Sequence, residues 1–215
     1  DDGTYYNANE VRHALNAAQN LFALLTLPIE RTASFTTTAA GCFHNISLQL
    51  TDFVVPLRLT TSAGVRILPA TVHELDGLSA SWRATAGTPT RYVQMGYDLL
   101  ALTPQYASAT SISITYAAMP TQFTIDTTAC ELPDEQQIWL VDYACWWLRL
   151  KEGGQELANA GEWLRRFVTA ARKYGDFVRR RSYGQKYDHV PFDLSSYDMG
   201  RLDIKLPPQR GPRNG

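Results

Sequence analysis

The strongest periodic pattern in the chain lies between Leu132 and Val178. Apolar residues recur there at spacings of three and four over two stretches, which Gly153 and Gly154 separate. This spacing places the apolar residues on one face of a helix, and glycine is a common residue at a helix end. The pattern therefore predicts two helices joined by a short turn.

The second of these helices has a single apolar face. Its seam consists of Leu157, Ala160, Leu164, Phe167, Ala171, Tyr174 and Val178. Charged residues occupy the opposite positions, where Glu162 is spaced to pair with Arg166 one turn later. One face is therefore expected in a core, and the other in water or against an acidic partner.

The first helix is apolar around most of its circumference. One stripe contains Ile138, Val141, Cys145 and Leu148, and the other positions include Trp139, Tyr143, Trp146, Trp147 and Leu150. Such a helix is normally buried on several sides. We interpret it as part of the intramolecular core or as a subunit interface, where Trp and Tyr are favoured anchors.

Asp142 lies among the apolar residues of this tryptophan-rich helix. A buried acid needs a partner. One interpretation is that Asp142 is a general base in a pocket. The favoured interpretation is a salt bridge to Arg149, to an arginine of the next helix or to a neighbouring subunit.

Residues 9–27 form another amphipathic pattern, which begins with Asn7 and Glu10 in the spacing of a capping box and ends before Pro28. Its apolar face contains Val11, Ala14, Leu15, Ala18, Leu21, Phe22 and Leu25. We expect this helix to pack on the other two as the third member of a bundle.

The segment between Glu30 and Ile125 instead has short alternating runs bounded by Gly and Pro, which predict strands. The predicted strands are residues 31–37, 45–50, 54–60, 65–72, 91–95, 98–103 and 111–117. Residues 104–108 are expected to join the last two strands as a hairpin, and residues 78–90 to form a long loop.

These elements predict an α+β fold, a three-helix bundle with an inserted antiparallel β domain and an extended C-terminal arm. The helical bundle domain covers residues 1–28 and 127–181, the inserted β domain residues 29–126, and the arm residues 182–215. Four aromatic residues in the arm, Tyr183, Tyr187, Phe192 and Tyr197, indicate docking on a partner. The alternative is that the arm folds back on its own domain.

Charge is distributed unevenly along the chain. Residues 1–148 carry 6 Lys or Arg against 13 Asp or Glu, a net charge of −7, whereas residues 149–215 carry 14 against 8, a net charge of +6. The basic face of the C-terminal part is formed by Arg165, Arg166, Arg172, Lys173, Arg179, Arg180 and Arg181. Because no helix-turn-helix spacing accompanies it, we expect a solvated face or loose contact with a polyanion.

Candidate chemistry is sparse. The three cysteines have no CxxC spacing and the four histidines are scattered. The sequence therefore predicts no disulfide framework, no metal site and no cofactor. The cysteine usage fits a reducing compartment. The longest apolar run is too short to span a bilayer. Glu74, Asp76 and Asp98 could form a carboxylate pair for glycoside hydrolysis, but no motif selects them.

Four stretches, taken in order, resemble the head-to-tail adaptors of tailed bacteriophages, which are also called connector or head-completion proteins. They are residues 9–19, residues 82–92 with Gly87-Thr88-Pro89 and Tyr92, residues 99–104, and Leu132-Pro133 through Leu140-Val141-Asp142-Tyr143-Ala144. Each motif is short, and their order carries the resemblance over most of residues 1–178.

The resemblance implies a non-enzymatic virion protein in the neck between head and tail, assembled in the cytoplasm of the host. Such adaptors form a homo-oligomeric ring, usually of twelve copies, which binds the portal protein and offers a platform to a tail or nozzle protein. Loose contact with packaged DNA and no contact with a membrane are implied as well. We expect an adaptor-type bundle, with a subunit interface formed by Trp139, Asp142, Trp146, Trp147 and Arg149. The aromatic residues of the arm are expected to dock on the portal or on a neighbouring subunit.

Two alternatives remain at this point. The β segment could be a binding module for host-surface glycans with the helices as its oligomerisation stalk, or a hydrolase that uses the carboxylates named above.

Overall fold

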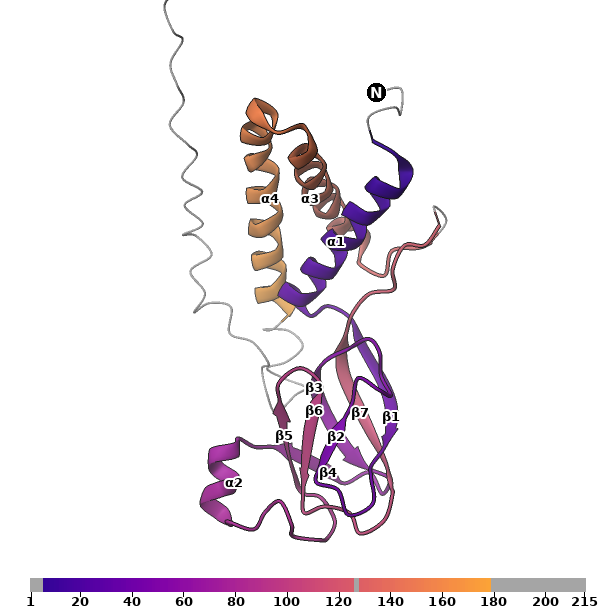
Figure 1. Ribbon diagram of the computed structural model, residues 1–215, viewed down its shortest axis with the longest axis vertical. Helices are drawn as coiled ribbons and strands as arrows, with labels where there is room; N and C mark the ends of the chain where they lie inside the picture. Colours follow the sequence, from indigo (N-terminus) through magenta and orange to yellow (C-terminus); the bar gives the residue numbers. More distant parts are fainter. Residues whose placement is uncertain (1–5, 126–127, 179–215) are drawn as a thin grey trace, which may run out of the picture.

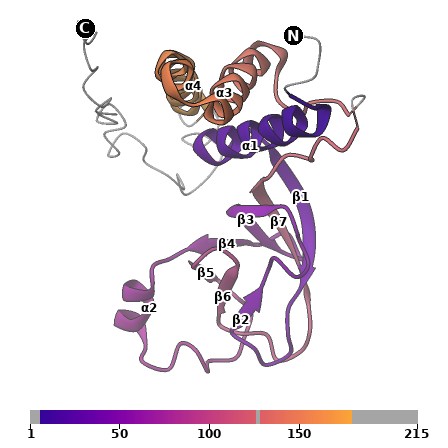
Figure 2. The same ribbon diagram turned by 45° about the horizontal axis from the view of Figure 1, so that its top comes forward.

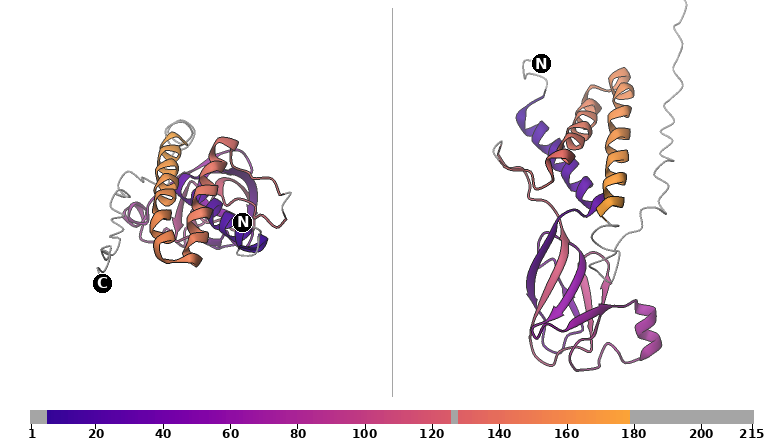
Figure 3. Two further views of the ribbon diagram at one scale, coloured as in Figure 1. Left: turned by 90° about the horizontal axis from the view of Figure 1, so that it is seen from above. Right: turned by 180° about the vertical axis from the view of Figure 1, so that it is seen from behind.

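The computed structural model describes residues 6–125 and 128–178. Three long helices lie together at one end of the molecule, α1 (Ala8–Thr26), α3 (Asp134–Glu152) and α4 (Gly154–Val178), and we call them the helical layer. A curled sheet occupies the other end, below the helices in Figure 1. Viewed from above, the three helices lie over the end of the sheet (Figure 3).

The start of α1 is fixed by the predicted capping box. The backbone N–H of Glu10 donates to Asn7 Oδ1 at 2.9 Å, and the backbone N–H of Asn7 donates to Glu10 Oε2 at 3.0 Å. These reciprocal bonds satisfy two donors that have no partner inside the helix. The helix ends at Leu27, which has a left-handed backbone with a φ of 51° and donates to Ala23 O. The predicted helix at residues 9–27 is confirmed.

The predicted pair of C-terminal helices is also confirmed. Pro133 precedes the first turn of α3, where Asp134 and Glu135 complement the positive end of the helix dipole. The turn into α4 is made by Gly153 and Gly154, whose φ values of 67° and 56° are accessible to glycine at little cost.

Seven strands form one sheet. In chain order they are β1 (Glu30–Thr36), β2 (Phe43–Asn45), β3 (Phe53–Thr61), β4 (Arg66–Pro69), β5 (Arg91–Met95), β6 (Leu99–Thr103) and β7 (Ser111–Ala118). Their order across the sheet is β1-β7-β3-β4-β5-β6-β2. All neighbouring pairs are antiparallel except β4 and β5, which are parallel.

The sheet curls on itself (Figure 2) and encloses an apolar core. Fully buried side chains come from strands far apart in the sheet order, including Phe35 of β1, Leu59 of β3, Leu100 of β6 and Ile114 of β7. Because these residues belong to one cluster, the two halves of the curled sheet bury each other.

A short helix, α2 (Val72–Leu78), connects β4 to β5 and projects from the far end of the sheet (Figure 1). Thr71 and Glu74 form a second capping box at its start. Leu75 is 2% exposed and packs in a cluster with Trp82 and Cys42, so the helix is anchored by its one buried residue.

The predicted architecture of a three-helix bundle with an inserted antiparallel β domain is therefore wrong. The described part of the chain has four helices, and its sheet is mixed because β4 and β5 run parallel. The protein is an α+β fold built around a seven-stranded curled sheet. The proposed domain boundaries near residues 28 and 127 remain a prediction, and the C-terminal arm lies outside the described residues.

Two predictions within the sheet are also wrong. The residues predicted as a strand from 45 to 50 mostly form a turn, because the strand β2 ends at Asn45. The last two strands, β6 and β7, form no hairpin. Instead β7 lies between β1 and β3, and β6 pairs with β5 and β2. Local alternation indicates a strand but carries no information on its neighbours.

The helical layer and the sheet meet in a small shared cluster. Leu27 at the end of α1 and Val178 of α4 pack against Val55 and Leu57 of β3 and Ala117 of β7. The chain enters β1 and leaves β7 at this same end, where Ala118 N donates to Ile29 O at 2.9 Å. The two connections to the helices therefore leave the sheet side by side.

Candidate functional site

The three helices of the helical layer meet in an aromatic core. The Tyr143 and Phe167 ring centroids are 4.9 Å apart, and those of Phe22 and Phe167 are 6.0 Å apart. Trp146 and Trp147 pack on Tyr143 at 5.3 and 6.1 Å and are partly buried. Both tryptophans thus have partners inside their own subunit, and their additional contact with a neighbouring subunit stays a prediction.

The side of α3 that carries Ile138 and Val141 is exposed. These two side chains are 52% and 48% exposed, and Cys145 one turn later is half-buried. Leu140 and Tyr143 on the other side of the same helix are buried against α1 and α4. The outer stripe of α3, defined as Ile138, Val141 and Cys145, is therefore apolar and uncovered by the described chain. An exposed apolar surface of this kind is typical of an interaction site.

Asp142 is buried beside the outer stripe, with 7% of its surface exposed. Its Oδ2 lies 3.2 Å from Nε of Arg166 on α4, yet accepts no hydrogen bond from the described residues. Burial raises the pKa of the Asp142 carboxyl, and the positive charge of Arg166 opposes this rise. The predicted salt bridge to an arginine of the next helix is confirmed, whereas a place for Asp142 in a subunit interface stays a prediction.

A groove of about 220 Å³ lies beside this pair, between α3 and α4. We call it the α3–α4 groove, and its lining residues are Trp139, Arg165, Arg166, Thr169, Ala170 and Lys173. The Arg166 guanidinium carbon is 6.0 Å from the centre of the Trp139 ring. The groove combines an aromatic wall with cationic ends, so it suits an apolar side chain flanked by carboxylates.

The basic face predicted on α4 divides into paired and unpaired residues. Arg165 forms an ion pair with Glu162 at 2.6 Å. The expected pair of Glu162 with Arg166 is wrong, because Arg166 forms its ion pair with Asp142. Within residues 6–125 and 128–178, the exposed residues Arg172 and Lys173 make no ion pair. The remaining three predicted members, Arg179 to Arg181, lie outside the described residues, as do the aromatic residues of the arm.

Arg149, the last residue expected at an interface, lies near the turn between α3 and α4. It forms ion pairs with Glu152 and with Glu156, the latter at 3.2 Å, and its guanidinium is 5.8 Å from the Trp163 ring centre. These contacts join the two helices across their turn. The structure thus gives Arg149 a role within the subunit, and its contact with a neighbour stays a prediction.

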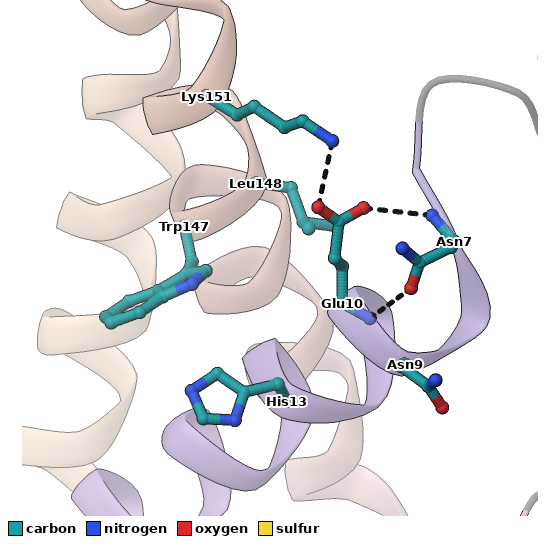
Figure 4. A pocket seen from close by; sticks show the side chains of 7 residues that line it. All are labelled: Asn7, Asn9, Glu10, His13, Trp147, Leu148 and Lys151. Atoms are coloured by element: carbon teal, nitrogen blue, oxygen red, sulfur yellow. Dashed lines mark hydrogen bonds and ion pairs between the residues drawn. The ribbon is translucent and has the colours of Figure 1, made fainter.

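A second groove, of about 350 Å³, lies between the start of α1 and the end of α3 (Figure 4). Lys151 Nζ pairs with Glu10 Oε1 at 2.8 Å across it, and His13 lies edge-on to Trp147 at 6.3 Å. The sequence pattern did not indicate this site, because its residues come from helices about 140 positions apart in the chain. The groove ties α1 to α3 and leaves the His13 side chain exposed.

The carboxylates considered for hydrolysis have structural partners. Glu74 caps α2, Asp76 accepts a hydrogen bond from Trp82 Nε1 at 2.7 Å, and Asp98 accepts one from Asn45 at 3.1 Å. In the part of the chain that the structure describes, no group of three or more His, Cys, Asp or Glu residues could hold a metal ion. None of the helices described here is long and apolar enough to cross a membrane.

The chain matches the model of a known protein family. The family model described as SU10 adaptor protein matches residues 2–188 of the chain. No curated protein matches it.

Proposed function

The chain belongs to the SU10 adaptor protein family, and we propose that it forms the ring that connects the portal of a phage capsid to the tail. As an adaptor it is a structural component of the phage virion. The proposed ring lies in the neck, helps to close the DNA-filled head, and contains twelve copies if it follows the adaptors that the sequence resembles. It is assembled in the cytoplasm of the host.

The observation that carries this proposal, beside the family, is the pair of chemically different surfaces on the helical layer. The outer stripe of α3 is apolar, whereas the outward face of α4 is basic. A closed ring of identical copies needs two different contact surfaces on each copy, one for each neighbour. A protein with two such surfaces suits this geometry better than one with a single self-complementary patch.

The other proposed partners are the portal protein and a tail or nozzle protein. Trp139, a member of the predicted interface, lines the α3–α4 groove and is half-buried there, which supports its contact with a partner. The unpaired cations Arg172 and Lys173 support loose contact with packaged DNA, since phosphate groups attract lysine and arginine without regard to sequence.

Mass measurement of the full chain, alone and mixed with purified portal protein, tests the proposal. We expect a closed ring or a portal complex with many copies of the 24.1 kDa chain, visible as a ring by electron microscopy. A chain that keeps the mass of a monomer both alone and with portal would refute it. A portal preparation from which the ring-contacting surface has been removed is the matched control.

One observation favours a second candidate, the binding of host-surface glycans by the sheet. Tyr97, at the turn between β5 and β6, is 90% exposed, and the neighbouring Asp98 carboxylate accepts hydrogen bonds from Asn45 and Ser47. An exposed aromatic ring beside fixed polar groups suits a sugar. Binding of the full chain to host polysaccharide, lost in Tyr97→Ala but kept in Leu78→Ala, which also alters an exposed apolar residue, would support this candidate.

A further inference from the structure

The antiparallel packing of α3 and α4 determines which of their residues lie at the same height. Asp142 contacts Arg166, Tyr143 contacts Phe167, and Arg149 contacts Glu156. Continuing this register by about two turns towards the start of α3 reaches Asp134 and Glu135 on one helix and Arg172 and Lys173 on the other. The two acidic and the two basic residues are therefore level with each other.

Both sets of charges are available to a partner. Asp134, Glu135, Arg172 and Lys173 are exposed, and none of the four makes an ion pair within the described ranges. The acidic pair lies at the start of α3, where it complements the helix dipole. The basic pair lies on the outward face of α4.

The outer stripe of α3 and the α3–α4 groove continue the two charged sets at the next height. On α3, the exposed side chains of Ile138 and Val141 follow one and two turns after Asp134. On α4, the level positions are Thr169 and Arg166, both in the lining of the α3–α4 groove. The outer stripe of α3 and the α3–α4 groove thus lie at matching heights along the two helices.

We infer that the start of α3 in one copy docks on the outward face of α4 in the next copy of the proposed ring. Ile138 and Val141 enter the α3–α4 groove against Trp139, and Asp134 and Glu135 face Lys173 and Arg172. The partner is a second copy of this chain because a rotation about an axis along the helix pair keeps both sets level. This inference rests on the proposed ring and specifies its contact surfaces.

The interface is heterologous, since a different surface of each copy takes part. Burial of Ile138 and Val141 supplies the apolar core of the contact, and the flanking charges set its register and exclude a reversed orientation. An open chain of copies keeps one unused outer stripe at one end and one unused groove at the other until the ring closes.

Two variants of the full chain test the pairing. Asp134→Lys with Glu135→Lys reverses the acidic set, and Arg172→Glu with Lys173→Glu reverses the basic set. Each variant alone places like charges across every contact, which opposes association, so we expect loss of the ring and the mass of a single chain. Mixed in equal amounts, the two variants face each other with opposite charges at every contact, and we expect rings of alternating copies.

Circular dichroism and thermal melting establish that both variants fold, and Arg58→Glu, an exposed charge on β3, is the control that should assemble as the wild type does. Assembly of either variant alone at wild-type level would overturn the inference, as would a mixture of folded variants that stays monomeric while the wild type forms rings. A wild-type chain that is monomeric alone and with portal would instead overturn the ring itself, and this interface with it.

Discussion

Asn16 and Phe123 are joined by two hydrogen bonds across 107 positions of the chain. Asn16 Nδ2 donates to the Phe123 carbonyl at 3.0 Å, and the Phe123 N–H donates to Asn16 Oδ1 at 2.7 Å. Gln19, one turn later and fully buried, donates to the Thr121 carbonyl at 3.0 Å. The side chains of α1 therefore take the place of a neighbouring strand for the segment that leads from β7 towards α3.

Replacing Asn16 with alanine should destabilise the protein by about 1–3 kcal/mol, because it leaves a partly buried N–H and carbonyl without their partners. Urea unfolding monitored by circular dichroism measures the change. Asn9→Ala is the matched control on the same helix, where the side chain is exposed and contacts Arg12. Equal losses in the two variants would show that the Phe123 contact contributes nothing.

Two glycines of α4 should respond to alanine with opposite signs. A Cβ at Gly175 would lie 3.2 Å from the Leu25 carbonyl oxygen, so α1 would have to move, and we expect a loss of stability. A Cβ at Gly161 meets nothing within 4 Å, and alanine there should stabilise the helix by about 0.5–1 kcal/mol. Thermal unfolding of both variants decides, and a stabilising Gly175→Ala would contradict the close approach of α1 and α4.

Removing Arg166 should cost more than removing the charge of Asp142. Arg166→Met leaves the buried carboxylate without its cation and should destabilise the fold by about 1–3 kcal/mol at pH 7. Asp142→Asn retains the shape without the charge, and its effect should be smaller.

The cost of Arg166→Met should also depend on pH. The pKa of Asp142 is raised in the folded protein, so its ionisation opposes folding, and stability falls as the pH rises through that pKa. Below pH about 4, where the carboxyl is protonated in the unfolded chain too, the variant should approach the wild type. A penalty that stays constant from pH 3 to pH 7 would argue against this explanation.

His44 should make the fold sensitive to mild acid. Its side chain is 3% exposed, and Nδ1 accepts a hydrogen bond from the Thr38 N–H at 3.2 Å. Burial lowers the pKa of His44. The unfolded chain therefore binds a proton more readily, and the stability present above the ordinary histidine pKa of about 6.5 is lost as the pH falls towards the folded value.

His44→Asn, which retains an acceptor without the titration, should flatten the dependence of the free energy of unfolding on pH between about 5 and 7. His13→Asn is the control, because this histidine is exposed. The two variants should differ in slope, and the same slope in both would exclude His44 as the cause.

The long helices could be predicted because their signals are local. The capping box of Asn7 and Glu10 and the glycines after Glu152 lie within the elements they delimit. The same kind of signal at Thr71 and Glu74 was missed, because the apolar alternation before it indicated a strand through residue 72.

The arrangement of the elements could not be predicted, because contacts distant in the chain determine it. The parallel pair of β4 and β5 and the place of β7 between β1 and β3 depend on registers that no short pattern records. The apolar stripe of Ile138 and Val141 was visible in the sequence. Its outward direction was not, because it depends on which sides of α3 are covered by α1 and α4.

The adjacent exits of the chain from β1 and β7 have a mechanical consequence. If the helices are held in a ring and a tail pulls on the sheet, both connections carry tension from the same edge, where Ile29 and Ala118 are hydrogen-bonded. The load then acts on two neighbouring strands in the same direction and does not slide one past the other. To draw these two strands out of the sheet, the hydrogen bonds between β7 and β3 and the apolar core shared with the other strands would have to give way.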